Sequence, residues 1–143
     1  MEKFISKLVY LPKPWTSISY FLLVIAALIL FFGRNLESLR IPFLLAWITE
    51  FYTHISNFSL ILMVYTAVGY MALLFDVKTR FLLVLALAFG GINMITESFI
   101  TILNTPDLTD AYFGYAAVSV ALTYLLIVKN YGLNPNPLLN QKA

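Results

Sequence analysis

Polar side chains recur at helical spacing between residues 93 and 104, inside and just after an apolar run. Asn93, Glu97, Thr101 and Asn104 lie at i, i+4, i+8 and i+11, which places them on one face of a helix. A carboxylate near hydrocarbon depth is costly, and intramembrane acids mark functional sites by default. Such a face must meet the bundle interior or a wet cavity, with Glu97 either ionised and paired or neutral. The alternative is a glutamate that merely reaches headgroup water.

A second polar face lies earlier in the chain. Glu50, His54 and Asn57 occur at i, i+4 and i+7. His54 is the only histidine; a neutral imidazole can bind a metal ion, and Glu50 can orient it as a base. The alternative is an interfacial histidine that extends to water. One histidine excludes a haem held by two histidines of one chain, and no motif indicates a cofactor.

Two further acids, Asp107 and Asp110, follow Asn104-Thr105-Pro106 and precede the next apolar run. They either complete the same outer cluster or are solvated, and Asp107 has the position of a helix N-cap. No catalytic or metal-binding motif is present. The candidate ligand-binding residues are therefore Glu50, His54, Asn93, Glu97, Thr101, Asp107 and Asp110.

The composition decides which kind of fold holds these residues. The 143 residues are 61% hydrophobic and 11% charged, with a mean hydropathy of +0.86, whereas soluble domains are about 25% charged. This indicates an integral membrane protein. The absence of cysteine excludes disulfides and thiolate metal sites. The net charge of +2 and the scattered basic residues argue against nucleic acid as a partner.

The apolar runs predict an all-α membrane bundle of four helices, at about residues 17–33, 55–75, 81–103 and 111–128. Residues 1–16 form a basic lead. No small-residue cleavage site follows the first apolar run, so we expect it to be retained. Residues 34–54 contain a polar turn and then either an interfacial helix or the outer end of the second span. The short link at 76–80 makes the second and third helices antiparallel neighbours. Residues 130–143, rich in Gly, Pro and Asn, predict a flexible tail.

The basic residues predict the orientation. With four spans, seven of them fall on one side of the membrane: Lys3, Lys7, Lys13, Lys78, Arg80, Lys129 and Lys142. Only Arg34 and Arg40 fall on the other side. The positive-inside rule therefore puts both termini in the cytoplasm. Five of the seven acids lie at or toward the outer side: Glu37, Glu50, Glu97, Asp107 and Asp110.

Over residues 50–126 the chain resembles the VanZ-like family of small membrane proteins. The family has an acid and a His before the second helix, matched by Glu50 and His54. It has a Glu late in the third helix, matched by Glu97, and then an acidic turn leading into a small-residue helix. The sequence departs from the family in lacking the Gln after this Glu, the Arg before the turn and the Asn at position 114. The resemblance implies a role at the cell envelope, linked in some members to glycopeptide-antibiotic tolerance.

Three functions follow from these observations. The first is an envelope protein of a bacterial-type plasma membrane, whose outer cluster binds a headgroup, a glycan or a cation. The second is a non-catalytic accessory subunit that packs against other membrane subunits or a second copy of itself. The third is a conducting subunit, against which the single embedded acid and the lack of an inverted repeat argue. The sequence favours a non-enzymatic role, because no Ser or Cys nucleophile motif is present. In a hydrolytic protein, His54 with a carboxylate would be the acid/base pair.

Overall fold

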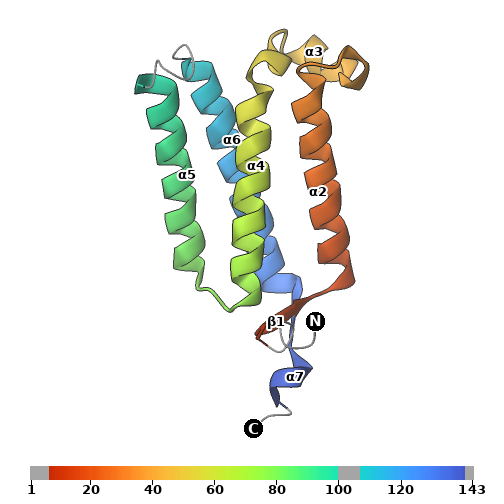
Figure 1. Ribbon diagram of the computed structural model, residues 1–143, viewed down its shortest axis with the longest axis vertical. Helices are drawn as coiled ribbons and strands as arrows, with labels where there is room; N and C mark the ends of the chain where they lie inside the picture. The colour runs from red at the N-terminus through yellow and green to blue at the C-terminus, as the bar shows by residue number, and fades with distance from the viewer. Residues whose placement is uncertain (1–6, 100–106, 141–143) are drawn as a thin grey trace.

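The computed structural model describes residues 7–99 and 107–140, in which four long helices stand side by side (Figure 1). These are α2 (Pro14–Gly33), α4 (Phe51–Leu74), α5 (Thr79–Phe99) and α6 (Leu108–Tyr131). Among the described residues, these four are long and apolar enough to cross a membrane. The shorter elements are β1 (Tyr10–Pro12), η1 (Glu37–Leu39), α3 (Pro42–Trp47), β2 (Leu133–Pro135) and α7 (Pro137–Asn140).

The long helices begin two to four residues earlier than the hydropathy predicts, and the early starts of α2 and α6 have local causes. Pro14 occupies the first turn of α2, where its missing N–H is no loss. Asp107 caps α6 by accepting a hydrogen bond from the Thr109 backbone N–H. As a result Asp110, predicted in a turn, lies in the first turn of α6. His54 likewise lies inside α4.

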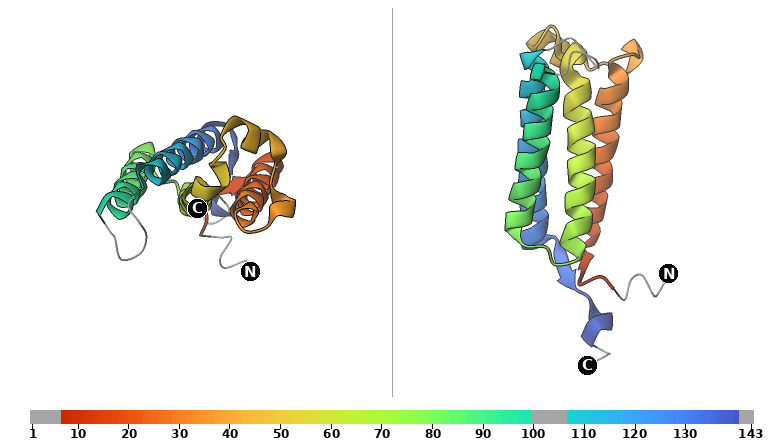
Figure 2. Two further views of the ribbon diagram at one scale, coloured as in Figure 1. Left: turned by 90° about the horizontal axis from the view of Figure 1, so that it is seen from above. Right: turned by 60° about the vertical axis from the view of Figure 1, so that its left-hand side comes forward.

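The helices are ordered α2, α4, α6, α5 across the bundle, with α2 and α5 on opposite flanks (Figures 1 and 2). In their most apolar segments, α4 and α6 have 44% and 39% of their residues buried, against 17% for α2 and 22% for α5. The short link between α4 and α5 does make them antiparallel. However, α5 packs mainly on α6 rather than on its sequence neighbour α4.

Small residues allow the close approach of α4 and α6. Ala117 and Ala121 are fully buried on α6, in line with Gly114. A Cβ added at Gly69 of α4 would lie 2.3 Å from a methyl of Leu125 of α6. Without a hydrophobic force between helices in lipid, such close packing is a main source of association.

Both ends of the described chain lie at the same end of the bundle, where β1 pairs antiparallel with β2 (Figure 1). Asn136 is buried there, and its side-chain amide donates to the Leu8 carbonyl at 2.7 Å. The flexible tail predicted from residue 130 is therefore corrected for residues 133–140, which form β2 and α7. The Gly, Pro and Asn content of this segment indicated a loose tail. The composition could not show that the segment pairs with β1, more than a hundred residues earlier in the sequence.

The opposite end of the bundle carries η1 and α3 (Figure 1). The chain is extended at Ile48 and helical again only from Phe51, so α3 and α4 are separate helices. The turn between α4 and α5 lies at the terminal end, where Asp76 has a left-handed backbone with φ of 62°.

Candidate functional site

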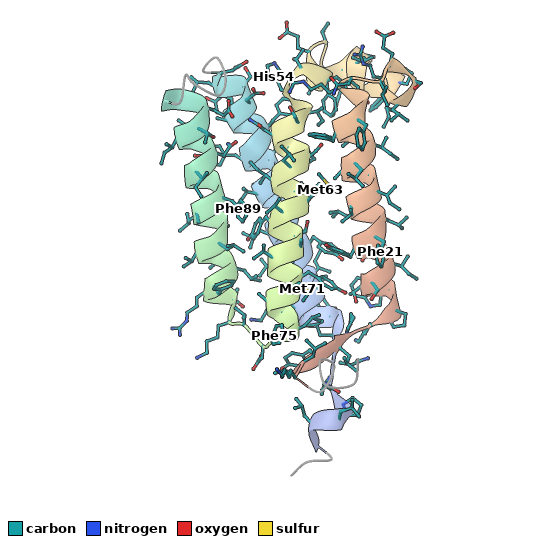
Figure 3. All side chains as sticks on the ribbon, in the orientation of Figure 1. Phe21, His54, Met63, Met71, Phe75 and Phe89 are labelled. Carbon is teal, nitrogen blue, oxygen red and sulfur yellow. The ribbon has the colours of Figure 1, made fainter. Side chains whose placement is uncertain are left out.

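The site is built around His54, which the first turn of α4 places at the α3 end of the bundle (Figure 3). His54 is only 8% exposed, so the alternative of an imidazole that extends to water does not fit the structure. Its ring packs 5.7 Å from the ring of Phe113 of α6, measured between centroids. Phe113 also contacts Phe51 edge-on, which fixes one side of the imidazole in apolar surroundings.

Two carboxylates at the start of α6 face the same imidazole nitrogen. Nδ1 of His54 lies 2.9 Å from Oδ1 of Asp110 and 3.5 Å from Oδ2 of Asp107. The early start of α6 is what brings them here, because Asp107 caps the helix and Asp110 falls one turn later. The Thr109 backbone N–H, with a smaller contribution from His54, lowers the pKa of Asp107 below its ordinary value of 3.8.

The second imidazole nitrogen faces Glu50, the residue immediately before α4. Nε2 of His54 lies 3.7 Å from Oε2 of Glu50. The side chains become more exposed in the order His54, Asp110, Asp107 and Glu50, at 11%, 14%, 39% and 78%. His54 and Asp110 therefore form the buried part of the cluster, and Asp107 and Glu50 form its exposed, acidic part. A positively charged ligand can enter from the exposed side.

Glu97 belongs to a second, more deeply placed set of hydrogen bonds. Its Oε1 accepts a 2.8 Å hydrogen bond from the Asn57 side-chain amide, and its Oε2 is buried without a hydrogen-bond partner among the described residues. Asn93, one turn earlier on α5, donates at 2.9 Å to the Ala111 carbonyl of α6. Both Asn93 and Glu97 are buried, at 5% and 7% exposure, so this part of the predicted polar face does turn inward.

The structure thus divides the predicted cluster in two. One part, the His54 cluster, joins Glu50, His54, Asp107 and Asp110. The other, the Glu97 pair, joins Glu97 to Asn57. Thr101 and Asn104 lie outside the described residues. Asn57 is absent from the predicted site, although its position seven residues after Glu50 on the His54 face was the signal that could have identified it.

The donor atoms of His54, Asp107 and Asp110 all lie within 4.8 Å of one another. Ligand atoms that share one ion at about 2.0–2.2 Å are separated by about 3.0–3.5 Å from their neighbours. The two distances from His54 Nδ1, 2.9 and 3.5 Å, lie close to this range. Two of the three spacings therefore match those of ligand atoms around one cation, and all three ligand atoms lie within 4.8 Å.

By length and composition, the four long helices indicate a multi-pass α-helical membrane protein with a polar cluster at one end. Comparisons of the chain with protein-family models, with curated protein sequences and with solved structures found no match. The function is therefore inferred from the geometry of the two polar sets.

Proposed function

We propose that this protein is a VanZ-like envelope protein that binds a divalent cation at the outer end of its helix bundle. The observation that carries the proposal is the convergence of Asp107 and Asp110 on Nδ1 of the buried His54. An imidazole with two carboxylates is a mixed nitrogen and oxygen donor set, which suits Zn²⁺ and Mn²⁺. Three carboxylates around one histidine also disfavour an anionic ligand such as a phosphate headgroup.

Glu50 supports the proposal by its place on the other side of the ring. A cation bound at Nδ1 requires the imidazole proton on Nε2. Oε2 of Glu50 lies 3.7 Å from Nε2 and can accept this proton's hydrogen bond after a small adjustment. A carboxylate behind a metal-bound histidine is a common arrangement, since it fixes the tautomer and raises the basicity of the ligand nitrogen.

The side of the membrane is part of the proposal. The described ends of the chain and the α4–α5 turn lie at one end of the bundle, and His54 lies at the other (Figures 1 and 3). The excess of Lys and Arg in the terminal segments and this turn favours the cytoplasm for that end. The His54 cluster then faces the cell exterior, where an envelope protein would meet extracellular Zn²⁺ or Mn²⁺.

The test is metal binding by the purified protein in detergent, with Zn²⁺ followed by calorimetry and Mn²⁺ by electron paramagnetic resonance. The wild type should bind one ion per chain. His54→Ala and Asp110→Asn should each weaken binding at least about tenfold, because each removes a ligand atom or its charge. Glu37→Gln is the matched control, since it removes an acid at the same end with 85% side-chain exposure. Wild-type binding that is absent, or that Asp110→Asn leaves unchanged, would contradict the proposal.

A second candidate function is that of an accessory subunit in a larger membrane complex. A groove on the surface of α5 supports it. Between α5 and α6 lies an apolar groove of about 570 Å³, whose lining includes Ala86, Gly90 and Gly91. Small residues of this kind let a neighbouring helix approach closely. Purification in mild detergent separates the candidates: a defined complex supports the subunit, and a stable monomer with intact metal binding supports the cation-binding protein.

A further inference from the structure

A groove between α4 and α5 opens on the surface of the bundle, separate from the His54 cluster. It has a volume of about 260 Å³. Each helix contributes one face, with lining residues at i, i+3, i+4 and i+7: Asn57, Leu60, Ile61 and Val64 on α4, and Phe89, Ile92, Asn93 and Thr96, followed by Glu97, on α5. The groove exists because α5 packs on α6 and makes few contacts with α4.

The lining is polar at one end and apolar along the rest. Asn57 lies one turn after His54 on α4 and Glu97 lies near the end of α5, whereas Phe89 lies nearer the middle of the bundle (Figure 3). From Glu97 to Phe89 the groove follows eight residues of helix, or about 12 Å. This is close to the hydrocarbon depth of one leaflet, about 15 Å. The polarity therefore changes in the direction in which a lipid changes from headgroup to chain.

At the polar end of the groove, one oxygen of the Glu97 side chain lacks a hydrogen-bond donor among the described residues. Glu97 is 93% buried, and its Oε2 has no hydrogen-bond partner among residues 7–99 and 107–140. A buried carboxylate oxygen left unpaired is costly. Two side-chain donors that line the groove are already engaged: Asn57 donates to Glu97 itself, and Thr96 donates to the Asn93 carbonyl. A ligand that pairs with an ionised Glu97 must donate to Oε2, so a headgroup that offers only acceptors does not fit this state.

The apolar part of the groove faces outward. Leu60, Val64 and Ile92 at its sides are 46%, 47% and 61% exposed, as expected for residues that meet lipid chains. Its inner end is closed by Phe89, whose ring stacks on the fully buried Tyr65 with centroids 5.5 Å apart. The groove is thus open to the bilayer at the side and closed toward the bundle core.

We propose that this groove binds a phospholipid with a primary ammonium headgroup, drawn from the leaflet that surrounds the His54 end. The ammonium donates an N–H to Oε2 of Glu97 and neutralises the carboxylate. One acyl chain lies along Leu60, Val64 and Ile92. The site would make the protein selective for phosphatidylethanolamine over phosphatidylcholine, because the trimethylated nitrogen of phosphatidylcholine carries a charge but no N–H.

The test compares these two lipids, which share the phosphate and the acyl chains. Protein in nanodiscs of equal parts phosphatidylethanolamine and phosphatidylcholine is transferred to detergent, and the retained lipid is measured by native mass spectrometry. The wild type should retain phosphatidylethanolamine on the order of tenfold more than phosphatidylcholine, the range of a charge-assisted hydrogen bond. Glu97→Gln should bring the ratio close to one, since the amide NH₂ replaces the acceptor oxygen. Glu37→Gln should leave the ratio unchanged.

A second variant tests the groove without touching the carboxylate. Val64→Trp should fill the groove and lower retention of both lipids, whereas Val84→Trp, at an exposed position of α5 outside the groove, should not. Equal retention of the two lipids by the wild type would overturn the proposal, as would a ratio that survives Glu97→Gln. The two proposals are separated by exchanging the variants. Metal binding is measured in the Glu97→Gln protein and lipid selectivity in the Asp110→Asn protein, so the failure of one proposal is distinguished from the failure of the other.

Discussion

At the scale of the residue, Asp107 has two partners. Its carboxylate accepts the hydrogen bond that caps α6 from the Thr109 backbone N–H, and it also lies 3.5 Å from His54 Nδ1. The cap begins the helix early enough for Asp110 to reach His54 as well. One side chain therefore both starts the helix and helps to form the cluster.

This arrangement predicts a pH dependence of stability. The pKa of Asp107 is lowered in the folded protein, so the ionised carboxylate favours folding. Its contribution is present above the ordinary value of 3.8 and is lost as the pH falls through the lowered folded pKa. Asp107→Asn keeps an acceptor for the Thr109 N–H but does not titrate. Thermal unfolding in detergent should therefore show a stability gap between wild type and Asp107→Asn at pH 6 that narrows by pH 3. A gap that stays constant with pH would contradict this assignment.

The identity of the site residues was partly predictable from the sequence. Spacing alone placed Glu50, His54 and Asn57 on one helical face, and charge placed Asp107 and Asp110 at the same end. Spacing could not show that His54 is buried, because its burial depends on Phe113 of another helix. Nor could it show that Asn57 bonds Glu97, forty residues away. Contacts between helices depend on the packing rotation of each helix, which no local pattern records.

At the scale of the element, the contact between α5 and α6 depends on Asn93 fitting against a glycine. The Asn93 amide donates to the Ala111 carbonyl, and a Cβ built on Gly114 would lie 2.3 Å from the same amide nitrogen. The hydrogen bond is possible only because position 114 has no side chain.

We therefore expect Gly114→Ala to destabilise the protein by about 1–3 kcal/mol, the range for overpacking with loss of a buried hydrogen bond. Gly91→Ala is the matched control, since it is also in a helix but an added Cβ meets nothing within 4 Å. It should be neutral or stabilise by up to about 1 kcal/mol through helix propensity. Unfolding in a denaturing detergent measures both changes.

A double-mutant cycle with Asn93→Ala identifies the cause. If the clash with Asn93 accounts for the loss, Gly114→Ala should cost much less in the Asn93→Ala background. An equal cost in both backgrounds would place the effect elsewhere in the helix.

The helices themselves were predictable, but their packing order was not. The hydropathy predicts four helices, and the described residues contain four helices long and apolar enough to cross a membrane. A short loop led to the expectation that the second and third helices are close neighbours. In the structure the small-residue face of α6 packs against α4, and Asn93 holds α5 to α6. The small residues of α6 and the buried amide of Asn93 thus determine which helices pack together more than the length of the connecting loop does.

At the scale of the whole molecule, the two ends of the bundle differ in chemistry. The terminal end is tied by the pairing of β1 with β2 and by the bond from Lys129 to the Val77 carbonyl at 2.8 Å. The other end holds the His54 cluster, the polar end of the α4–α5 groove and the exposed apolar residues of α3. Cation binding and lipid binding would thus take place on the same side of the membrane.

The proposed orientation can be tested by labelling single cysteines, because the chain contains none of its own. Ser38 lies exposed in η1 at the His54 end, and Thr79 lies exposed at the start of α5 at the terminal end. With both termini in the cytoplasm, a membrane-impermeant maleimide should label Ser38→Cys in intact cells. Thr79→Cys should be labelled only after the cells are opened. Neither substitution changes a charge, so the balance of Lys and Arg that sets the orientation is preserved. The reverse pattern would place the His54 cluster in the cytoplasm, where the ion it meets would come from the cell's own metal pool.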